Sequence, residues 1–82
     1  MIEREQIEKI NEALAEEFEI PVDQITPEAD IRTTLDLDPM KAMQVVVIVK
    51  RYTGIVIYPR QFPRFTTFQT LYDYIAEKNI LA

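Results

Sequence analysis

The segment from Asp38 to Gly54 restricts the possible fold more than any other part of the chain. It reads DPMKAMQVVVIVKRYTG and ends on the only glycine of the sequence. Aspartate is a favoured N-cap, proline suits the first helical position, and glycine commonly ends helices. These signals predict a helix. The β-branched run Val45 to Val49 leaves one alternative open, a hairpin in which it pairs with residues 55 to 58.

Apolar residues at helical spacing predict two further helices, one near each end of the chain. The first covers residues 3 to 18. The last begins at a capping box formed by Thr66 and Gln69 and ends near residues 78 and 79. Between the middle and last helices, the motif PRQFPRF predicts one short helical turn. The side chains expected to face the core from these segments are Ile7, Ile10, Leu14, Phe18, Phe62, Phe65, Phe68, Leu71, Tyr72 and Ile75.

A long loop, residues 19 to 38, joins the first two helices. Pro21 and Pro27 interrupt its periodicity, and Thr26 to Glu28 has the composition of a single helical turn. The pattern as a whole predicts an all-α fold, a small four-helix bundle with three longer helices, one short helix and a long first loop. The aliphatic residues expected to attach this loop to the core are Val22, Ile25, Ile31, Leu35 and Leu37.

The composition excludes several classes of function. A chain of 82 residues has room for one compact domain, so residues 1 to 82 are expected to form a single domain. It contains no Cys, His, Ser or Trp, which excludes disulfides, Cys/His zinc sites and Ser-His catalysis. No nucleophile–base pair indicates an enzyme. No apolar run is long enough for a membrane span, and the N-terminus is too charged for a signal peptide, so we expect a cytoplasmic monomer.

The charge is divided along the chain. Residues 1 to 38 carry twelve Asp and Glu against three Lys and Arg, whereas residues 39 to 82 carry two against six. This division is compatible with two solvated faces of opposite sign or with a dedicated docking surface. It indicates which partners each half would attract, and it does not indicate a fold.

Three motifs stand in the order and spacing found in acyl carrier proteins. LDLDPMKAM opens the middle helix, GIVIYP follows that helix, and TTFQTLYDYI belongs to the last helix. No insertion is needed between Asp38 and Ile75. The chain therefore resembles the acyl carrier protein family over nearly its whole length. The resemblance implies a bundle of that type and a place in fatty acid or polyketide-type acyl metabolism.

The resemblance ends at the residue that carries the prosthetic group. The family attaches phosphopantetheine to a serine directly after the position of Asp38, and this chain has Pro39 there. Attachment needs a side-chain oxygen that attacks the pyrophosphate of coenzyme A, and proline has none. Proline is structurally suited to the first helical position. We therefore expect no cofactor as the chain is written, and a non-carrying binding partner of acyl-processing enzymes.

The outer face of the same helix also departs from the family. In acyl carrier proteins this face is typically acidic and docks on basic patches of partner enzymes, whereas Lys41, Gln44, Lys50 and Arg51 occupy it here. Like charges across an interface disfavour binding, so these positions are candidate partner-binding residues. The alternative is an unrelated small helical adaptor that binds an anionic protein or nucleic acid through the basic C-terminal half.

Three other groups of residues have competing interpretations. The two aspartates that flank Leu37 could bind a divalent cation, but a helix cap and a solvated neighbour fit them better. Aromatic residues and arginines alternate from residue 58 to 65 and could stack on a nucleic acid, but the acidic total favours core packing. Met40, Met43 and Val47 could face a partner or a sequestered chain, although Met and Val at this spacing are more typical of a core.

Overall fold

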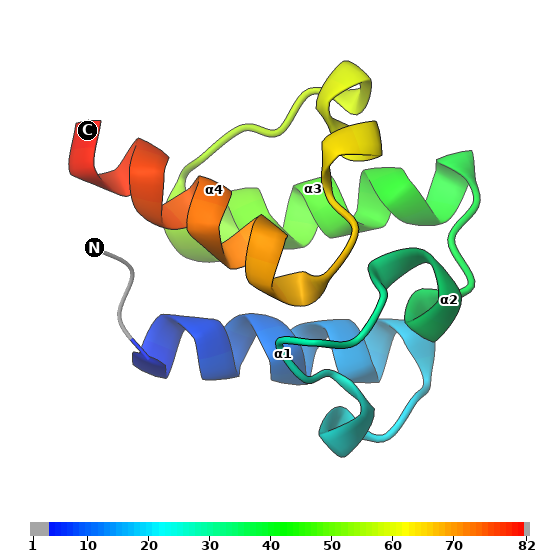
Figure 1. Ribbon diagram of the computed structural model, residues 1–82. Coiled ribbons are helices and arrows are strands. Elements are labelled where there is room, and N and C mark those ends of the chain that lie inside the picture. Colours follow the sequence, from blue (N-terminus) through cyan, green and yellow to red (C-terminus); the bar gives the residue numbers. More distant parts are fainter. Residues whose placement is uncertain (1–3, 82) are drawn as a thin grey trace.

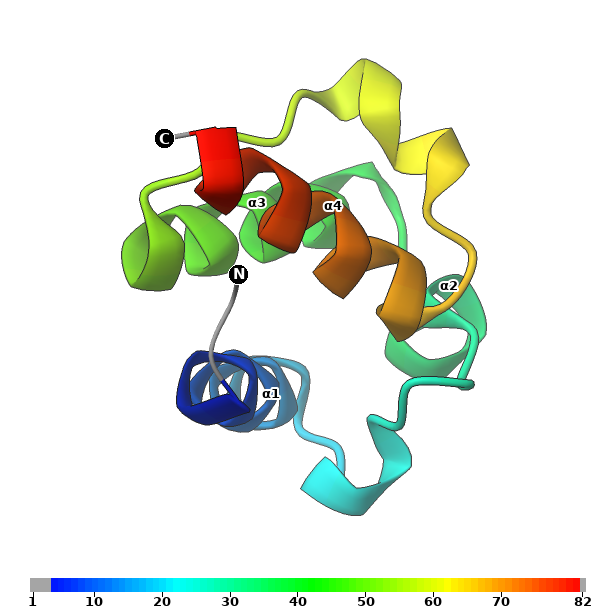
Figure 2. The same cartoon turned by 60° about the vertical axis from the view of Figure 1, so that its left-hand side comes forward.

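The computed structural model describes residues 4 to 81, and the side chains of residues 4 to 78. This part of the chain is predominantly helical and contains no strand, which confirms the predicted all-α bundle with three longer helices. Figures 1 and 2 show α1 on one side of the molecule, opposite α3 and α4, with α2 beside the start of α3. The helices are α1 (Arg4–Phe18), η1 (Val22–Gln24), α2 (Ile31–Leu35), α3 (Pro39–Thr53), η2 (Pro59–Arg64) and α4 (Phe68–Leu81).

The helix predicted from Asp38 onward is present as α3, and the hairpin alternative is wrong. The Asp38 carboxylate accepts a hydrogen bond of 2.8 Å from the backbone N–H of Lys41. At the other end Gly54 has a φ of 76°, and its N–H donates to the Lys50 carbonyl over 2.8 Å. The run Val45 to Val49 lies inside this helix. Its β-branched residues are tolerated there because most of them bury apolar surface in the core.

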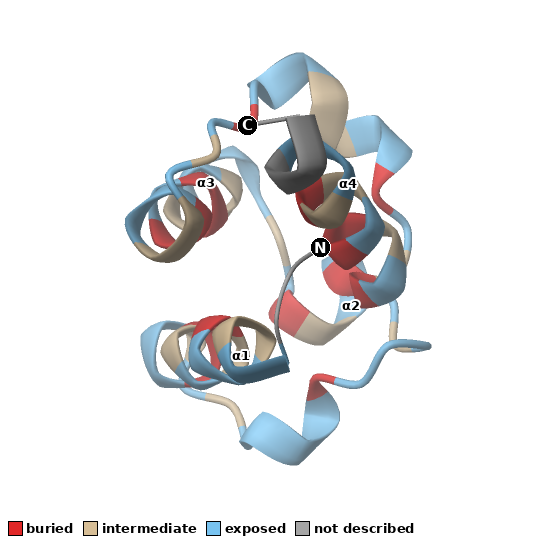
Figure 3. Cartoon of the chain, turned by 90° about the vertical axis from the view of Figure 1, so that its left-hand side faces the viewer, coloured by how far each residue is buried: buried red, intermediate tan, exposed pale blue. Residues whose placement is uncertain are grey.

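The core lies between the three longer helices, whose buried positions face one another in Figure 3. Tyr72 is part of this core, and its hydroxyl hydrogen-bonds the side-chain oxygen of Asn11. Burial raises the pKa of Tyr72 to about 12, although the bond to Asn11 acts in the opposite direction. The other buried residues are Ile10, Leu14, Ala15, Ile25, Ile31, Leu35, Val45, Val46, Ile48, Val49, Ile57, Phe65, Phe68, Leu71 and Ile75.

The long first loop contains more helix than the sequence predicts. Residues 22 to 24 form η1 and residues 31 to 35 form α2. The single turn predicted at residues 26 to 28 is present as a hydrogen-bonded turn and not as a helix, because the Ala29 N–H donates to the Thr26 carbonyl over 3.1 Å. The side chain of Asp30 caps α2 by accepting from the Thr33 N–H over 2.8 Å. That hydrogen bond is the main reason why the pKa of Asp30 is lowered. Val22 is half exposed and does not anchor the loop.

The start of α4 also differs from the prediction. The capping box at Thr66 is wrong, because α4 begins at Phe68 and Thr67 precedes it. The segment before α4 instead pairs with the long loop: the Ile31 N–H donates to the Thr66 carbonyl over 2.9 Å, and the Phe68 N–H donates to the Ala29 carbonyl over 3.1 Å. These tertiary bonds hold the backbone of residue 66 outside the helix. At its far end α4 continues to Leu81, past the predicted end.

The segment between α3 and α4 agrees with the prediction. The motif PRQFPRF forms η2, with Phe65 buried and Phe62 packed against the core. Their rings meet edge to face, with centroids 5.8 Å apart. The Gln61 side chain donates to the Tyr74 hydroxyl over 2.8 Å, so η2 is tied to α4.

Glu19 offers a direct test of the backbone at the end of α1. It has a φ of 55°, and the next N–H, that of Ile20, donates to the Ala15 carbonyl over 3.0 Å. This arrangement favours glycine, because a Cβ at positive φ costs free energy. We expect Glu19→Gly to raise the free energy of unfolding in urea by ~0.5–1 kcal/mol. The control Glu17→Gly, inside α1, should lower it by about 1 kcal/mol. A destabilised Glu19→Gly variant would contradict this interpretation.

Candidate functional site

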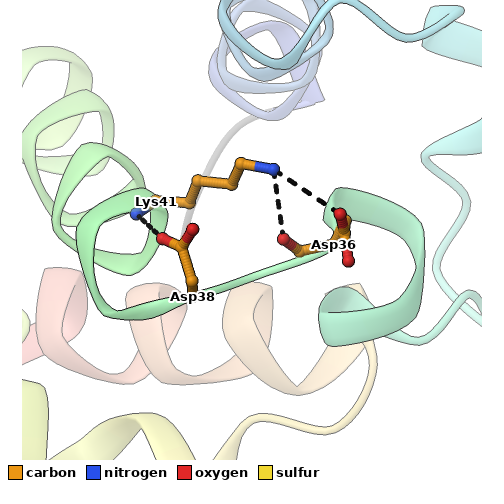
Figure 4. Close-up of polar contacts among 3 residues, drawn as sticks. All are labelled: Asp36, Asp38 and Lys41. Carbon is orange, nitrogen blue, oxygen red and sulfur yellow. Dashed lines mark hydrogen bonds and ion pairs between the residues drawn. The ribbon is translucent and has the colours of Figure 1, made fainter.

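One lysine side chain reaches from α3 back to the turn that precedes the helix. Asp36 has a left-handed backbone with a φ of 51°. The Lys41 ammonium donates to the Asp36 carbonyl over 3.3 Å and lies 3.7 Å from its carboxylate (Figure 4). The backbone N–H of Lys41 donates a hydrogen bond to the Asp38 carboxylate. Lys41 therefore connects the loop to the helix, a role that the sequence pattern did not indicate.

Pro39 is exposed and occupies the first position of α3, directly after the Asp38 cap. A helix start leaves the N–H of this position without an intrahelical partner, so proline fits without loss of a hydrogen bond. It presents only ring carbons to solvent. The hydroxyls that stand closest in the sequence belong to Thr33 and Thr34, and both lie in α2, ahead of the turn. The first turn of α3 thus offers no hydroxyl nucleophile.

A hollow of about 370 Å³ lies beside Pro39, between the first half of α3 and η2. Most of its lining is apolar, and one arginine, Arg32, stands at its wall. The start of α3 and η2 therefore line the same hollow. The sequence pattern did not predict that they are neighbours, because they are about twenty residues apart. The full lining is Arg32, Pro39, Ala42, Met43, Pro59, Phe62 and Pro63.

The outward face of α3 carries three large apolar side chains. Met40 is 77% exposed, Met43 48% and Val47 51%. The interpretation of these residues as core is therefore wrong. The helix buries Val45, Val46, Ile48 and Val49 instead. The buried positions of α3 face α1 and α4 in Figure 3. The three exposed side chains recur at i, i+3 and i+7 and therefore share one side of α3.

The four predicted partner-binding residues do not form one group. Lys50 and Arg51 are exposed near the end of α3, and Gln44 is half-buried about two turns earlier. Lys41 instead turns to Asp36, with 37% of its side chain exposed. Gln44 and Arg51 line a groove of about 630 Å³ between α1 and α3, whose other wall carries Glu12, Glu16 and Glu17. Arg51 of α3 thus lies across this groove from a wall of α1 that carries these three glutamates and Lys9.

Two other candidate sites find no support in the structure. Among residues 4 to 78, no three Asp or Glu side chains gather in a way that could hold a metal ion. The alternating aromatic and arginine residues do not form one exposed surface. Phe65 is buried, whereas the Arg60 guanidinium stacks 5.1 Å from the centroid of the Tyr58 ring.

Within the described residues, no helix is both long and apolar enough to cross a membrane.

Comparison with known proteins agrees with the fold. The family model described as the phosphopantetheine attachment site matches residues 8 to 75, which covers most of the chain. The chain belongs to the acyl carrier protein family. Membership overturns the alternative of an unrelated helical adaptor. The match extends from α1 into α4 and spans the turn at Asp38 and Pro39.

Relatives in three bacteria support this membership. The chain is 34% identical to acyl carrier protein 2 of Ralstonia nicotianae over 67 residues, 82% of this chain and 83% of the relative. It is 27% identical to an acyl carrier protein of Rubrobacter xylanophilus over 77 residues, 93% and 95% of the two chains. It is 24% identical to polyketide-8 synthase acyl carrier protein 2 of Streptomyces avermitilis over 71 residues, 87% and 82% of the two chains. The similarity therefore covers whole carrier domains.

Proposed function

We propose that this protein is a non-carrying member of the acyl carrier protein family, which binds acyl-processing enzymes of fatty acid or polyketide synthesis without holding phosphopantetheine. The observation that supports it is Pro39 at the first position of α3. In the family the attachment serine follows the aspartate that corresponds to Asp38. The names of the matched relatives, acyl carrier proteins and a polyketide synthase carrier, support this choice of partners.

The missing step is a phosphoryl transfer. A serine oxygen would form a bond to the pantetheine-bearing phosphorus of coenzyme A, the pyrophosphate bond would break, and adenosine 3′,5′-bisphosphate would leave. Pro39 has neither the oxygen nor the proton that this exchange requires. Thr33 and Thr34 do not replace it, since they belong to α2 and precede the Asp38 cap. No catalytic role is proposed for the chain, and phosphopantetheine is not proposed as its cofactor.

The proposal is tested by incubating the chain with coenzyme A and a broad-specificity phosphopantetheinyl transferase. Intact-mass spectrometry should show an unchanged mass. A gain of one phosphopantetheinyl group would show that another residue accepts the arm, and would overturn the proposal. A carrier protein with an intact serine, treated in parallel, shows that the transferase is active.

Partner choice is proposed to depend on Lys50 and Arg51, the exposed cations of α3, and on Gln44 about two turns earlier. Lys41 contributes less, because its ammonium is already paired with Asp36. Enzymes whose docking patch is basic should bind this protein weakly, since like charges meet. The acidic total and the buried aromatics make nucleic acid a poor partner. We propose that the protein acts as a monomer in dilute solution and in the cytoplasm.

We expect the double variant Lys50→Glu/Arg51→Glu to bind a ketosynthase with a basic docking patch about tenfold more tightly than the parent, because two repulsive contacts become attractive. The gain should shrink as salt rises from low to physiological concentration, since exposed charges are screened. Titration by fluorescence anisotropy measures both effects. Arg64→Glu/Lys78→Glu is the matched control, because it changes the net charge equally but lies outside α3. Equal gains in both variants would show that only net charge matters.

A further inference from the structure

The outward face of α3 is apolar along its first half and basic at its end. Met40, Met43 and Val47 are exposed and share one side of the helix. Lys50 and Arg51 follow Val47 at i+3 and i+4, so these exposed cations continue the same side. No aspartate or glutamate occurs anywhere in α3. The face therefore combines an apolar row with two cations and carries no negative charge of its own.

The acidic residues of the turn before α3 do not neutralise these cations. Asp38 lies on the inward side of the helix, in phase with the buried valines, and its carboxylate accepts from the Lys41 N–H. Asp36 is paired with the Lys41 ammonium. Among the described side chains, no carboxylate lies within ion-pair distance of Lys50 or Arg51. The two cations are therefore available to the carboxylates of a partner.

The hollow beside Pro39 continues the apolar row. Met43 belongs to both, since it is exposed on the outward face and also lines the hollow. Arg32 is the only charged residue of that lining, and it lies on α2, beside the start of α3 (Figure 1). An apolar side chain of a partner fits such a hollow, and acidic residues next to it are attracted to Arg32 at one end and to Lys50 and Arg51 at the other.

We propose that this surface binds an acidic amphipathic helix of a partner protein. The helix places apolar side chains on the α3 row and in the hollow, and places carboxylates near the three cations. Helices that pack along each other match a row of this form. The inference rests on the proposed function, because it names the kind of docking surface that the same helix selects in a partner enzyme. The apolar row is small compared with the ~1,200–2,000 Å² of a stable interface, so the complex is weak and transient.

The flank of this face favours a narrow partner over an extended anionic surface. Val47 and Arg51 also line the groove between α1 and α3, whose other wall carries three glutamates and one lysine of α1. A lipid bilayer or a nucleic acid would bring its negative charges against these glutamates as well as against the cations. A single helix that lies along α3 contacts the apolar row and the cations and leaves the α1 wall uncovered.

Peptide titration tests the proposal on the full chain. The probe is a synthetic helix of about 18 residues, with leucines at every third or fourth position and glutamates beside them. Added to the isotopically labelled protein, it should shift the amide NMR signals of α3 and η2 more than those of α1. Two reference peptides have the same composition in scrambled order, or lysine in place of glutamate. Both should bind at least about tenfold more weakly, since each lacks either the apolar stripe or the complementary charge.

Single substitutions separate the two parts of the surface. Lys50→Glu should weaken binding of the acidic helix about fivefold, because an attraction becomes a repulsion. Lys78→Glu is the matched control, since it makes the same charge change on α4, and it should weaken binding by less than about twofold. Met43→Gln keeps the length of the side chain but removes an apolar contact, and should also weaken binding about fivefold.

Three results would overturn the proposal. They are no binding of the acidic helix, equal binding of the scrambled peptide, and α3 signals that shift with phosphatidylserine vesicles and not with the helix, which would assign the face to a membrane. None of them changes the intact mass of the chain after treatment with the transferase. A failure of this inference is therefore distinct from a failure of the proposed function.

Discussion

Pro39→Ser is expected to gain one phosphopantetheinyl group from coenzyme A in the presence of a broad-specificity transferase, whereas the parent gains none. The substitution places a hydroxyl at the first position of α3, directly after the Asp38 cap. Serine is acceptable at a helix start, so the fold should be kept. The loss of proline's restriction on the unfolded chain should cost only ~0.5–1 kcal/mol. Intact-mass spectrometry gives a yes-or-no result.

Pro39→Ala is the matched control, since it removes the ring without adding an oxygen. It should remain unmodified, as the parent does. If Pro39→Ser stays unmodified as well, the next cause to test is repulsion of the transferase by the basic end of α3. The variant for this test combines Pro39→Ser with Lys50→Glu and Arg51→Glu. A combined variant that still gains no mass would contradict the assignment of position 39 as the lost attachment site.

Phe68→Ala should remove a large part of the stability of the fold. The Phe68 side chain is fully buried in the core, and its ring lies 6.5 Å from that of Tyr72, centroid to centroid. Truncating a buried phenylalanine typically costs ~3–5 kcal/mol. A domain of this size has a free energy of unfolding of only ~5–10 kcal/mol. We therefore expect a much lower urea midpoint, or a chain that is largely unfolded at room temperature, by circular dichroism.

Val47→Ala is the control for this prediction, because it also truncates an apolar side chain on a long helix. Val47 is 51% exposed, so its free energy of unfolding should change by no more than about 0.5 kcal/mol. Similar losses in the two variants would mean that the burial pattern of α3 and α4 is not the one described above.

Local signals were sufficient for the bounds of α3. Asp38, Pro39 and Gly54 each favour a helix end through their own backbone and side chain, so the prediction did not depend on the rest of the fold. The sequence alone also shows that the start of α3 has no hydroxyl for attachment, because position 39 is a proline and the chain contains no serine. The spacing of the apolar residues likewise indicated α1 and α4.

Local signals failed where two segments compete for the same hydrogen bonds. Thr66 has the sequence of an N-cap, yet its carbonyl accepts from Ile31 of the long loop and α4 starts two residues later. The loop itself was predicted without α2. Its five residues are too few to form a stable helix alone, and the packing of Ile31 and Leu35 in the core supplies the missing stability.

The sequence by itself determined that residues 39 to 53 are helical and that position 39 has no nucleophile, because both follow from covalent structure and backbone preference. The face of α3 that is buried was decided only by the tertiary structure. This helix has apolar residues on every side, so its own pattern does not choose between Met40, Met43 and Val47 on one side and Val45 and Val49 on the other. Packing of α3 against α1 and α4 buries the compact valines and leaves the methionines exposed to solvent.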